Sequence, residues 1–242
     1  MKEKHNSPSL SEQDQLKKQA ALGAIDMIRS GMVLGLGTGS TVRFALEGLG
    51  QKLKSGQLTN IVGIPSSIQT EKLAKELGIP LTSYEKHEEV SLTVDGADEV
   101  DPQLNLIKGG GGALLREKIL AQASRRNIIM VDESKLSMQL GTLFSVPVEV
   151  LSLAWTLEAK YIESLGAKVD LRKSSDGNPY TSDQGNFILD CRFGPIPDPE
   201  KLADQLSRRA AVMEHGLFLG LATDVIVAGK EGVRHLKREV KE

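Results

Sequence analysis

Several features that are common in other classes of protein are absent from this chain. Its 242 residues include one cysteine, Cys191, which leaves no disulfide framework and no thiol metal site. No apolar run reaches the roughly 18 residues that a membrane-spanning helix needs, and the polar start MKEKHNSPSLSEQDQ lacks the hydrophobic segment of a secretory signal. The formal net charge of −2 lacks the basic excess expected for nucleic-acid binding. These absences predict a soluble cytoplasmic protein without a nucleic-acid or membrane partner.

The sequence signatures of common cofactors are missing too. The stretch GLGTGST at 35–41 spaces its glycines as GxGxG rather than GxGxxG, and the next strand-like run ends in PSS without the acid that binds a ribose hydroxyl. The GK[ST] ending of a Walker loop is also absent. The four histidines, at positions 5, 87, 215 and 235, show no ligand spacing. We therefore expect no nicotinamide, nucleotide or metal cofactor.

What the chain does contain is a dense polar segment between Leu92 and Glu117. A short apolar run is followed within seven positions by four acids, whose mutual repulsion calls for cations or bound protons: Asp95, Asp98, Glu99 and Asp101. Lys108 is the nearest cation, and the glycines at 109–112 let backbone N–H groups approach a ligand oxygen at the start of a helix. A solvated turn and a flexible loop are the alternative. Four glycines between a strand-like run and a helix favour a site.

Glu117 lies about one turn into the expected helix. Its neighbours three and four positions away are all apolar: Ala113, Leu114, Leu120 and Ala121. The carboxylate is therefore expected to face packed surroundings, where burial raises its pKa toward the range useful to a general base. Arg116 has similarly apolar neighbours. The pattern thus favours an inward Glu117 without proving it.

Apolar strand-like runs alternate with helical segments in the first part of the chain. The runs lie at 32–36, 61–64, 92–94 and 128–131, and helices are expected at 11–30, after GLGTGST and at 68–77. This alternation predicts an α/β fold with a doubly wound, mostly parallel sheet of Rossmann-like type. Ligands bind beyond the carboxyl ends of such strands. All four runs are followed there by polar residues, which predicts a site at this edge.

A second set of segments begins at about residue 145. Strands are expected at 146–150, 167–172 and 187–191, and helices at 155–165 and 198–211, in the pattern of a smaller α+β domain of ferredoxin-like type. The run GLFLGLATDVIVAG at 216–229 resembles the earlier buried strands. It is expected to return the chain to the first sheet. The predicted division is therefore 1–144 plus about 213–242 for the first domain and about 145–212 for the inserted one.

The loop GLGTGST suits a single phosphate group. Its backbone amides around Gly39, the N-terminus of the next helix and three hydroxyls can converge on one anion, the hydroxyls being those of Thr38, Ser40 and Thr41. A capped strand-to-helix turn is the alternative interpretation. Lys135 follows another strand end and could add positive charge, although a lone lysine is more often a surface residue.

These residue types together indicate one kind of chemistry. A phosphate loop, paired acids, a lysine, a glycine-rich amide cluster and a semi-buried glutamate suit proton abstraction beside the carbonyl of a phosphorylated sugar. A carboxylate would move the proton, and the lysine and amides would stabilise the oxygen charge of the resulting enediolate.

The motifs VDGADEVD, KGGGGALLREK, GLGTGST and VDESK, in this order and spacing, closely resemble those of the ribose-5-phosphate isomerase type A family. The resemblance extends over nearly the whole chain, including NFILD at 186–190 and GLFLG near 216. It implies an aldose-ketose isomerase of the non-oxidative pentose phosphate pathway. Such an enzyme interconverts D-ribose 5-phosphate and D-ribulose 5-phosphate through an enediolate without a cofactor. The resemblance also implies a homo-oligomer, a dimer or a tetramer.

The same resemblance implies a role for each site residue. Glu117 would carry the proton between C1 and C2, and Asp95 would assist ring opening. Asp98 would place the substrate hydroxyls, and Lys108 would stabilise the enediolate oxygen. The further residues implied to bind substrate are Thr38, Gly39, Ser40, Thr41, Gly96, Ala97, Gly109, Gly110, Gly111, Lys135 and Lys17.

Two other kinds of protein suit a similar scaffold, a different enzyme and a non-catalytic sensor. A sugar-phosphate deaminase or a lactonase would more naturally bring a catalytic histidine near the strand ends, where none is expected. A non-catalytic sugar-phosphate sensor needs to bind but not to move protons, so the presence of both Lys108 and Glu117 favours catalysis. The roughly thirty residues before the first strand are also too few for a helix-turn-helix module and a linker.

Overall fold

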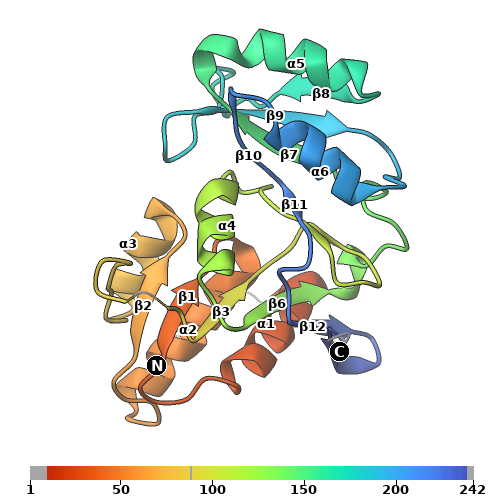
Figure 1. Ribbon diagram of the computed structural model, residues 1–242. Helices are drawn as coiled ribbons and strands as arrows, with labels where there is room; N and C mark the ends of the chain where they lie inside the picture. The colour runs from red at the N-terminus through yellow and green to blue at the C-terminus, as the bar shows by residue number, and fades with distance from the viewer. Residues whose placement is uncertain (1–9, 88, 239–242) are drawn as a thin grey trace, which may run out of the picture.

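The computed structural model describes residues 10–87 and 89–238 of the chain. The polar N-terminal stretch up to residue 9, with His5, lies outside them. Figure 1 shows two layered units, a larger one built around a central sheet and a smaller one stacked on it. Among the described residues, no helix is both long enough and apolar enough to cross a membrane.

A six-stranded sheet forms the centre of the larger unit, in the order β13-β12-β6-β3-β1-β2. All neighbouring pairs are parallel except β12 and β13, which are antiparallel. The strands are β1 (Val33–Leu36), β2 (Val62–Pro65), β3 (Leu92–Asp95), β6 (Asn127–Asp132), β12 (Asp224–Gly229) and β13 (Gly232–Lys237). The predicted doubly wound, mostly parallel sheet is confirmed.

Both faces of this sheet are covered because alternate residues of each strand point to opposite sides. Ile128 and Met130 of β6 join the core beneath α1 (Glu12–Ile25) and α2 (Ser40–Lys54). Ile129 and Val131 join a second core with Ala121 of α4 (Leu114–Gln122). A small antiparallel sheet completes that face; it contains β4 (Glu99–Val100), β5 (Leu106–Ile107) and β11 (Leu217–Phe218). Helix α3 (Ile68–Glu76) packs beside β2 and α2.

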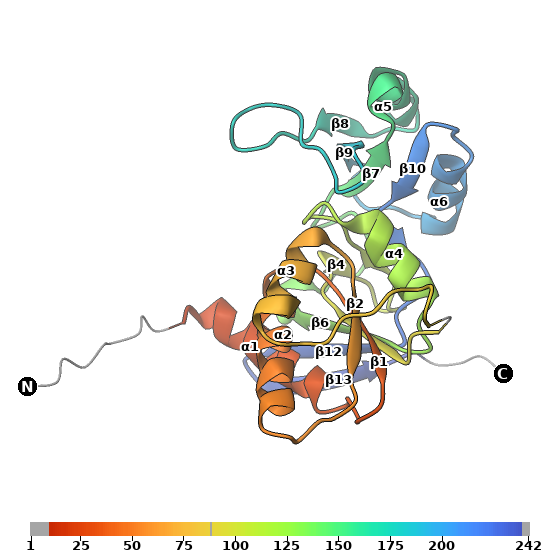
Figure 2. The same ribbon diagram turned by 90° about the vertical axis from the view of Figure 1, so that its left-hand side faces the viewer.

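The smaller unit is an antiparallel sheet with two helices. Its elements follow the chain as β7 (Val146–Val150), α5 (Trp155–Ser164), β8 (Lys168–Leu171), β9 (Phe187–Arg192), α6 (Pro199–Ser207) and β10 (Val212–His215). The order β10-β7-β9-β8 in a βαββαβ chain is the ferredoxin-like arrangement, as predicted. Strand β10 lies in this sheet although it extends past residue 213. The exact domain division stays a prediction. Figure 2 shows α4 next to the small unit.

The segment 216–229, predicted to return to the first sheet as one strand, forms two strands instead. Residues 217–218 form β11 beside β5, and only 224–229 join β6 in the central sheet. Gly220, at φ +70°, bends the chain between them, so the apolar run serves two sheets. The first helix is also shorter than predicted. Ser11 caps it, accepting from the Asp14 N–H, but tight turns end it at Ile25.

Candidate active site

A pocket of about 140 Å³ opens where β1, β3 and β6 end. Its wall contains fourteen of the fifteen predicted site residues, and the remaining one, Asp95, lies directly behind the wall against Lys108. The lining residues are Gln13, Lys17, Thr38, Gly39, Ser40, Thr41, Gly96, Ala97, Asp98, Lys108, Gly109, Gly110, Gly111, Glu117 and Lys135. Segments as far apart in the sequence as Lys17 and Lys135 therefore meet at one edge of the sheet.

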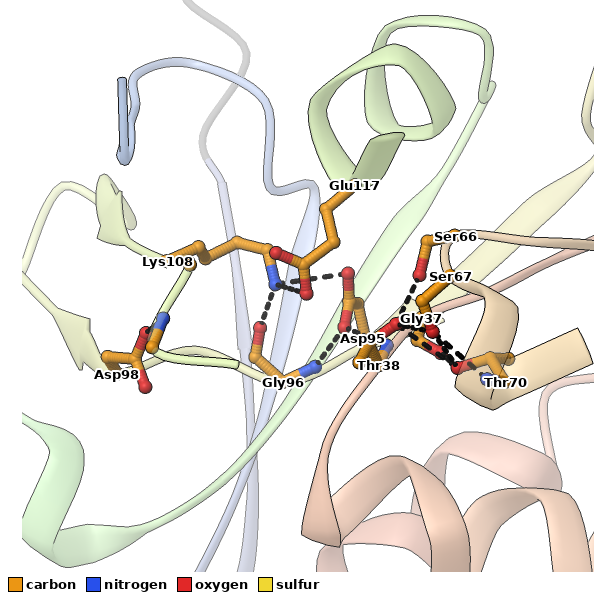
Figure 3. Close-up of polar contacts among 12 residues, drawn as sticks. Gly37, Thr38, Ser66, Ser67, Thr70, Asp95, Gly96, Asp98, Lys108 and Glu117 are labelled. Atoms are coloured by element: carbon orange, nitrogen blue, oxygen red, sulfur yellow. Dashed lines mark hydrogen bonds and ion pairs between the residues drawn. The ribbon is translucent and has the colours of Figure 1, made fainter. Parts of the chain in front are cut away.

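A buried cation with two buried carboxylates lies at the base of the pocket. The Nζ of Lys108 is 3.0 Å from Asp95 Oδ2 and 3.3 Å from Glu117 Oε1, and it donates to the Gly96 carbonyl at 2.5 Å (Figure 3). The side chains are 3–6% exposed. The charges are therefore paired in a site largely closed to water, where an uncompensated charge would be costly.

The local structure explains how these three groups meet. Asp95 ends β3, Lys108 follows β5, and Glu117 lies in the first turn of α4, whose N-terminal dipole favours a carboxylate. The Lys108 backbone N–H donates to the Gly216 carbonyl at 2.9 Å, which fixes the base of its side chain. Glu117 Oε2 is buried without a hydrogen-bond partner among the described residues. That oxygen is available to a ligand in the pocket.

Burial and neighbouring charge together raise the pKa of both Glu117 and Lys108, which favours the neutral form of the acid and the charged form of the amine. Burial raises the pKa of Glu117 to about 8, because the opposing attraction of Lys108 offsets desolvation only in part. Burial also favours the neutral amine of Lys108, but the charges of Asp95 and Glu117 outweigh it and hold its pKa above the ordinary value. Lys108 is thus a permanent cation, while Glu117 can take and return a proton near neutral pH.

Backbone groups after β1 and β3 hold the Asp95 carboxylate in place. Its Oδ1 accepts from the backbone N–H groups of Thr38 at 3.1 Å and Gly96 at 2.8 Å. Gly37 makes this approach possible, since a β-carbon there would overlap the Asp95 carboxylate. The carboxylate is therefore fixed by backbone groups of two strand ends.

Gly37→Ala is expected to lower kcat/KM by about 10²-fold, because the added methyl must displace the Asp95 carboxylate from Lys108. Gly48→Ala is the matched control. A β-carbon at Gly48, inside α2, meets only ordinary contacts such as Leu22 at 3.5 Å, and alanine favours the helix. Steady-state kinetics of both variants would check this. Wild-type turnover in Gly37→Ala would show that the position of Asp95 is not needed.

A buried cluster of hydroxyl groups supports the predicted phosphate loop. Thr38 Oγ1 lies 2.8 Å from Ser66 Oγ, 2.9 Å from Ser67 Oγ and 3.1 Å from Thr70 Oγ1 (Figure 3). Thr70 in turn donates to the Gly37 carbonyl at 2.7 Å. The Thr38 hydroxyl is thus engaged within the protein, whereas Ser40 and Thr41 open α2 at the pocket. This cluster connects the end of β2 to the loop after β1.

The acids after β3 are relieved in different ways. Asp98 Oδ2 accepts the Gly110 N–H at 2.7 Å on the pocket wall. The buried Glu99 carboxylate accepts backbone N–H groups from residues 141–144, and Asp101 accepts from Asn105. The expectation that cations or bound protons relieve the repulsion therefore describes Asp95 but is incomplete for Glu99 and Asp101. Backbone amides distant in the sequence take that role for Glu99, and the backbone and side-chain amides of nearby Asn105 take it for Asp101.

Sequence reasoning missed Gln13 and the hydroxyl cluster behind Thr38. Gln13 lines the pocket one helical turn before Lys17, so its spacing of four from that lysine was the available signal. Lys17 and Lys135, which the resemblance implies as substrate-binding residues, both line the pocket. The described histidines, at positions 87, 215 and 235, do not line this pocket. Within 10–87 and 89–238, no cluster of acids, histidines or cysteine suits a metal ion.

The fold and the pocket together define a class of protein. A Rossmann-like sheet carries a buried lysine, a carboxyl group with a raised pKa and a loop suited to phosphate. These are the functional groups that a sugar-phosphate isomerase needs. Residues 62–232 match the family described as ribose 5-phosphate isomerase A (phosphoriboisomerase A), and the chain belongs to this family. The predicted aldose-ketose isomerase is thereby confirmed, and the sensor, deaminase and lactonase alternatives are not favoured.

Close relatives span nearly the whole chain. A ribose-5-phosphate isomerase A from Desulfatibacillum aliphaticivorans is 55% identical over 228 residues, covering 94% of this chain and 99% of its own. A solved ribose 5-phosphate isomerase from Plasmodium falciparum is 40% identical with a TM-score of 0.91, covering 94% and 100%. A D-ribose-5-phosphate isomerase solved with phospho-erythronic acid is 42% identical with a TM-score of 0.92, again covering 94% and 100%.

Proposed function

We propose that this protein interconverts D-ribose 5-phosphate and D-ribulose 5-phosphate through an enediolate, as a step of the non-oxidative pentose phosphate pathway. One observation carries the proposal: Glu117, with a raised pKa and a free buried oxygen, lies 3.3 Å from the Lys108 ammonium at the base of the pocket. A proton acceptor and a fixed cation side by side suit a reaction that removes a proton and creates oxygen charge.

The reaction follows from the roles of these groups. With Asp95 assisting, the sugar ring opens to the aldehyde. Glu117 then removes the proton from C2, the electron pair forms the double bond between C1 and C2, and the carbonyl oxygen becomes an oxyanion stabilised by Lys108. A proton passes from the C2 hydroxyl to the C1 oxygen, and Glu117 returns its proton to C1. Asp98 holds substrate hydroxyls during both steps.

The phosphate group is expected to bind at the start of α2. Ser40 and Thr41 offer hydroxyls there, the helix dipole favours an anion, and Lys17 and Lys135 bring two cations to the same wall. Gln13 is proposed as a further ligand from α1. The phospho-erythronic acid complex of a related isomerase is consistent with this choice, since that ligand is a phosphorylated sugar acid.

The kcat/KM for ribose 5-phosphate is expected to rise about tenfold per pH unit from about pH 6.5 and to level off near pH 8. The reason is that only the deprotonated Glu117 can accept the C2 proton, and its pKa is raised to about 8. The substrate phosphate titrates lower, near pH 6, and Lys108 stays charged because its pKa is raised. Initial rates measured between about pH 6.5 and 9.5 would check this. A flat profile would contradict the assignment.

The proposed function itself is tested by ribulose 5-phosphate formation from ribose 5-phosphate, with purified protein in the presence of a chelator. Cofactor-free turnover would support it. Binding of ribose 5-phosphate without turnover would instead favour a sensor. We further propose a cytoplasmic homodimer, with a tetramer possible, on the strength of the family relationship. Light scattering of the purified protein would decide the oligomeric state.

A further inference from the structure

One arginine of the small domain, Arg172, contacts the glycine loop, residues 109–112, at the active site from the side away from the pocket. Arg172 directly follows β8, and its side chain is 13% exposed. Asp190 on the adjacent strand β9 holds its guanidinium at two points, with Nη2 2.5 Å from Oδ1 and Nε 3.0 Å from Oδ2. This bidentate pairing fixes the plane and direction of the guanidinium. The third nitrogen, Nη1, is left to point away from the small domain.

That nitrogen binds the glycine loop. Nη1 of Arg172 donates to the carbonyl of Gly109 at 2.9 Å and to the carbonyl of Gly110 at 3.1 Å. All peptide bonds among the described residues are trans, so the N–H of each peptide points opposite to its carbonyl. The N–H groups of Gly110 and Gly111 therefore point away from Arg172, toward the side of the pocket.

These N–H groups belong to the active-site wall. The Gly110 N–H donates to Asp98 Oδ2 at 2.7 Å, and both glycines line the pocket. Glycine peptides are the most easily rotated in a chain, so their direction needs an external restraint. On the other side of the loop lies a separate open cavity of about 650 Å³, lined by Gly110, Arg172, Asp190 and Arg192. Arg172 holds the loop peptides against rotation into that space.

We propose that Arg172, oriented by Asp190, is a positioning residue that aims the Gly111 amide at the enediolate oxygens and, through the Gly110 N–H, holds Asp98 toward the substrate. The inference rests on the proposed isomerase function. It gives the small domain a part in the chemistry although, within the described residues, none of its side chains lines the pocket. Preorganised amides of this kind act in the transition state more than in substrate binding.

A purely structural role for Arg172 would be to join the two domains, but other contacts also do so. Asp183 of the small domain accepts the Ile68 N–H at 2.8 Å and lies 3.3 Å from Arg116. Lys118 of α4 donates to Glu214 at 2.6 Å. Loss of the Arg172 contacts should therefore leave the domains docked, which makes the catalytic effect separable from folding.

Three variants test the proposal. Arg172→Met removes the restraint, Arg172→Lys keeps the charge without the two-sided guanidinium, and Arg192→Met is the matched control. Arg192 ends β9 and lines the same cavity, but its side chain makes no hydrogen bond or ion pair within the described residues. For each variant we would measure kcat and KM for ribose 5-phosphate, the affinity for phospho-erythronic acid and the thermal midpoint of unfolding. Phospho-erythronic acid is chosen because its planar carboxylate resembles the enediolate.

Arg172→Met is expected to lower kcat by about 30- to 100-fold with KM within about threefold, and to weaken phospho-erythronic acid by at least about tenfold. Arg172→Lys should keep a near-normal thermal midpoint yet lose most of the kcat. Arg192→Met should match wild type in all respects. A normal kcat in Arg172→Met, or an equal weakening of substrate and phospho-erythronic acid, would overturn the proposal.

Failure of the proposed function would show differently. In that case the wild-type protein would not isomerise ribose 5-phosphate at all. The ratio of affinities for phospho-erythronic acid and ribose 5-phosphate would still report whether Arg172 aims the loop amides, since this readout needs binding alone.

Discussion

Glu117→Gln is expected to lower kcat by about 10³- to 10⁴-fold while leaving KM within about threefold. Glutamine has the same shape and fits the same packing, but its amide cannot accept the C2 proton. Binding is expected to survive because the proposed phosphate and hydroxyl ligands come from other segments, the loop after β1 and Asp98 after β3. Kinetics with ribose 5-phosphate would measure the effect. Glu71→Gln, at a partly exposed glutamate of α3 that does not line the pocket, is the control and should keep full activity.

Glu117→Gln is also expected to stabilise the protein, whereas the loss of a favourable contact alone would destabilise it. The folded-state pKa of Glu117 is raised above its unfolded value, so its contribution to stability is full at low pH and is lost as pH rises through about 8. Glutamine carries no charge to bury. The thermal midpoint of Glu117→Gln should therefore rise relative to wild type between about pH 6 and pH 9. A turnover within tenfold of wild type would exclude Glu117 as the base.

Much of the fold could be predicted because its main strands are short, largely apolar runs. Strands β3 and β6 are buried on both faces, and such runs are distinct in sequence. The strands that escaped prediction lack this signal. β4 and β5 contain two residues each, and the side chains of β13 are nearly all exposed. Their positions depend on pairing with distant segments, which periodicity cannot reveal.

The residues of the candidate site likewise differ in how far the sequence could predict them. Asp95, Lys108 and Glu117 could be predicted because they lie close together in sequence, within one motif-rich stretch. Arg172 could not, since it reaches the glycine loop from 62 and 63 positions away, across the two domains. The Ser66 hydroxyl lies behind Thr38 by a similar long-range contact. Sequence patterns thus identify groups that lie at the pocket more readily than groups that orient them.

Lys108→Met is expected to remove nearly all activity, by at least about 10³-fold in kcat/KM, and to destabilise the fold by about 3–5 kcal/mol near pH 8. The substitution leaves Asp95 and Glu117 buried without their cation. Lys118→Met is the matched control. Lys118 is another buried lysine, paired with Glu214, but it does not line the pocket, so its loss should lower stability and leave kcat of the folded protein largely intact.

The pH dependence of this destabilisation distinguishes a charge effect from lost packing. Lys108 lowers the pKa of Glu117, so its removal raises that pKa further. Stability in the variant is then retained at low pH, where the carboxyl holds a proton, and lost as pH rises. The deficit should be smaller near pH 5 than near pH 8, and an equal deficit at both would indicate packing alone.

The double variant Lys108→Met with Glu117→Gln completes the test by chemical denaturation. If the two groups interact as an ion pair, the double variant should be more stable than Lys108→Met alone, because the uncompensated carboxylate is gone. It should still be inactive. Recovery of stability without recovery of turnover would mean that the cation expected to stabilise the enediolate also stabilises the fold by offsetting the charge of the buried Glu117 carboxylate.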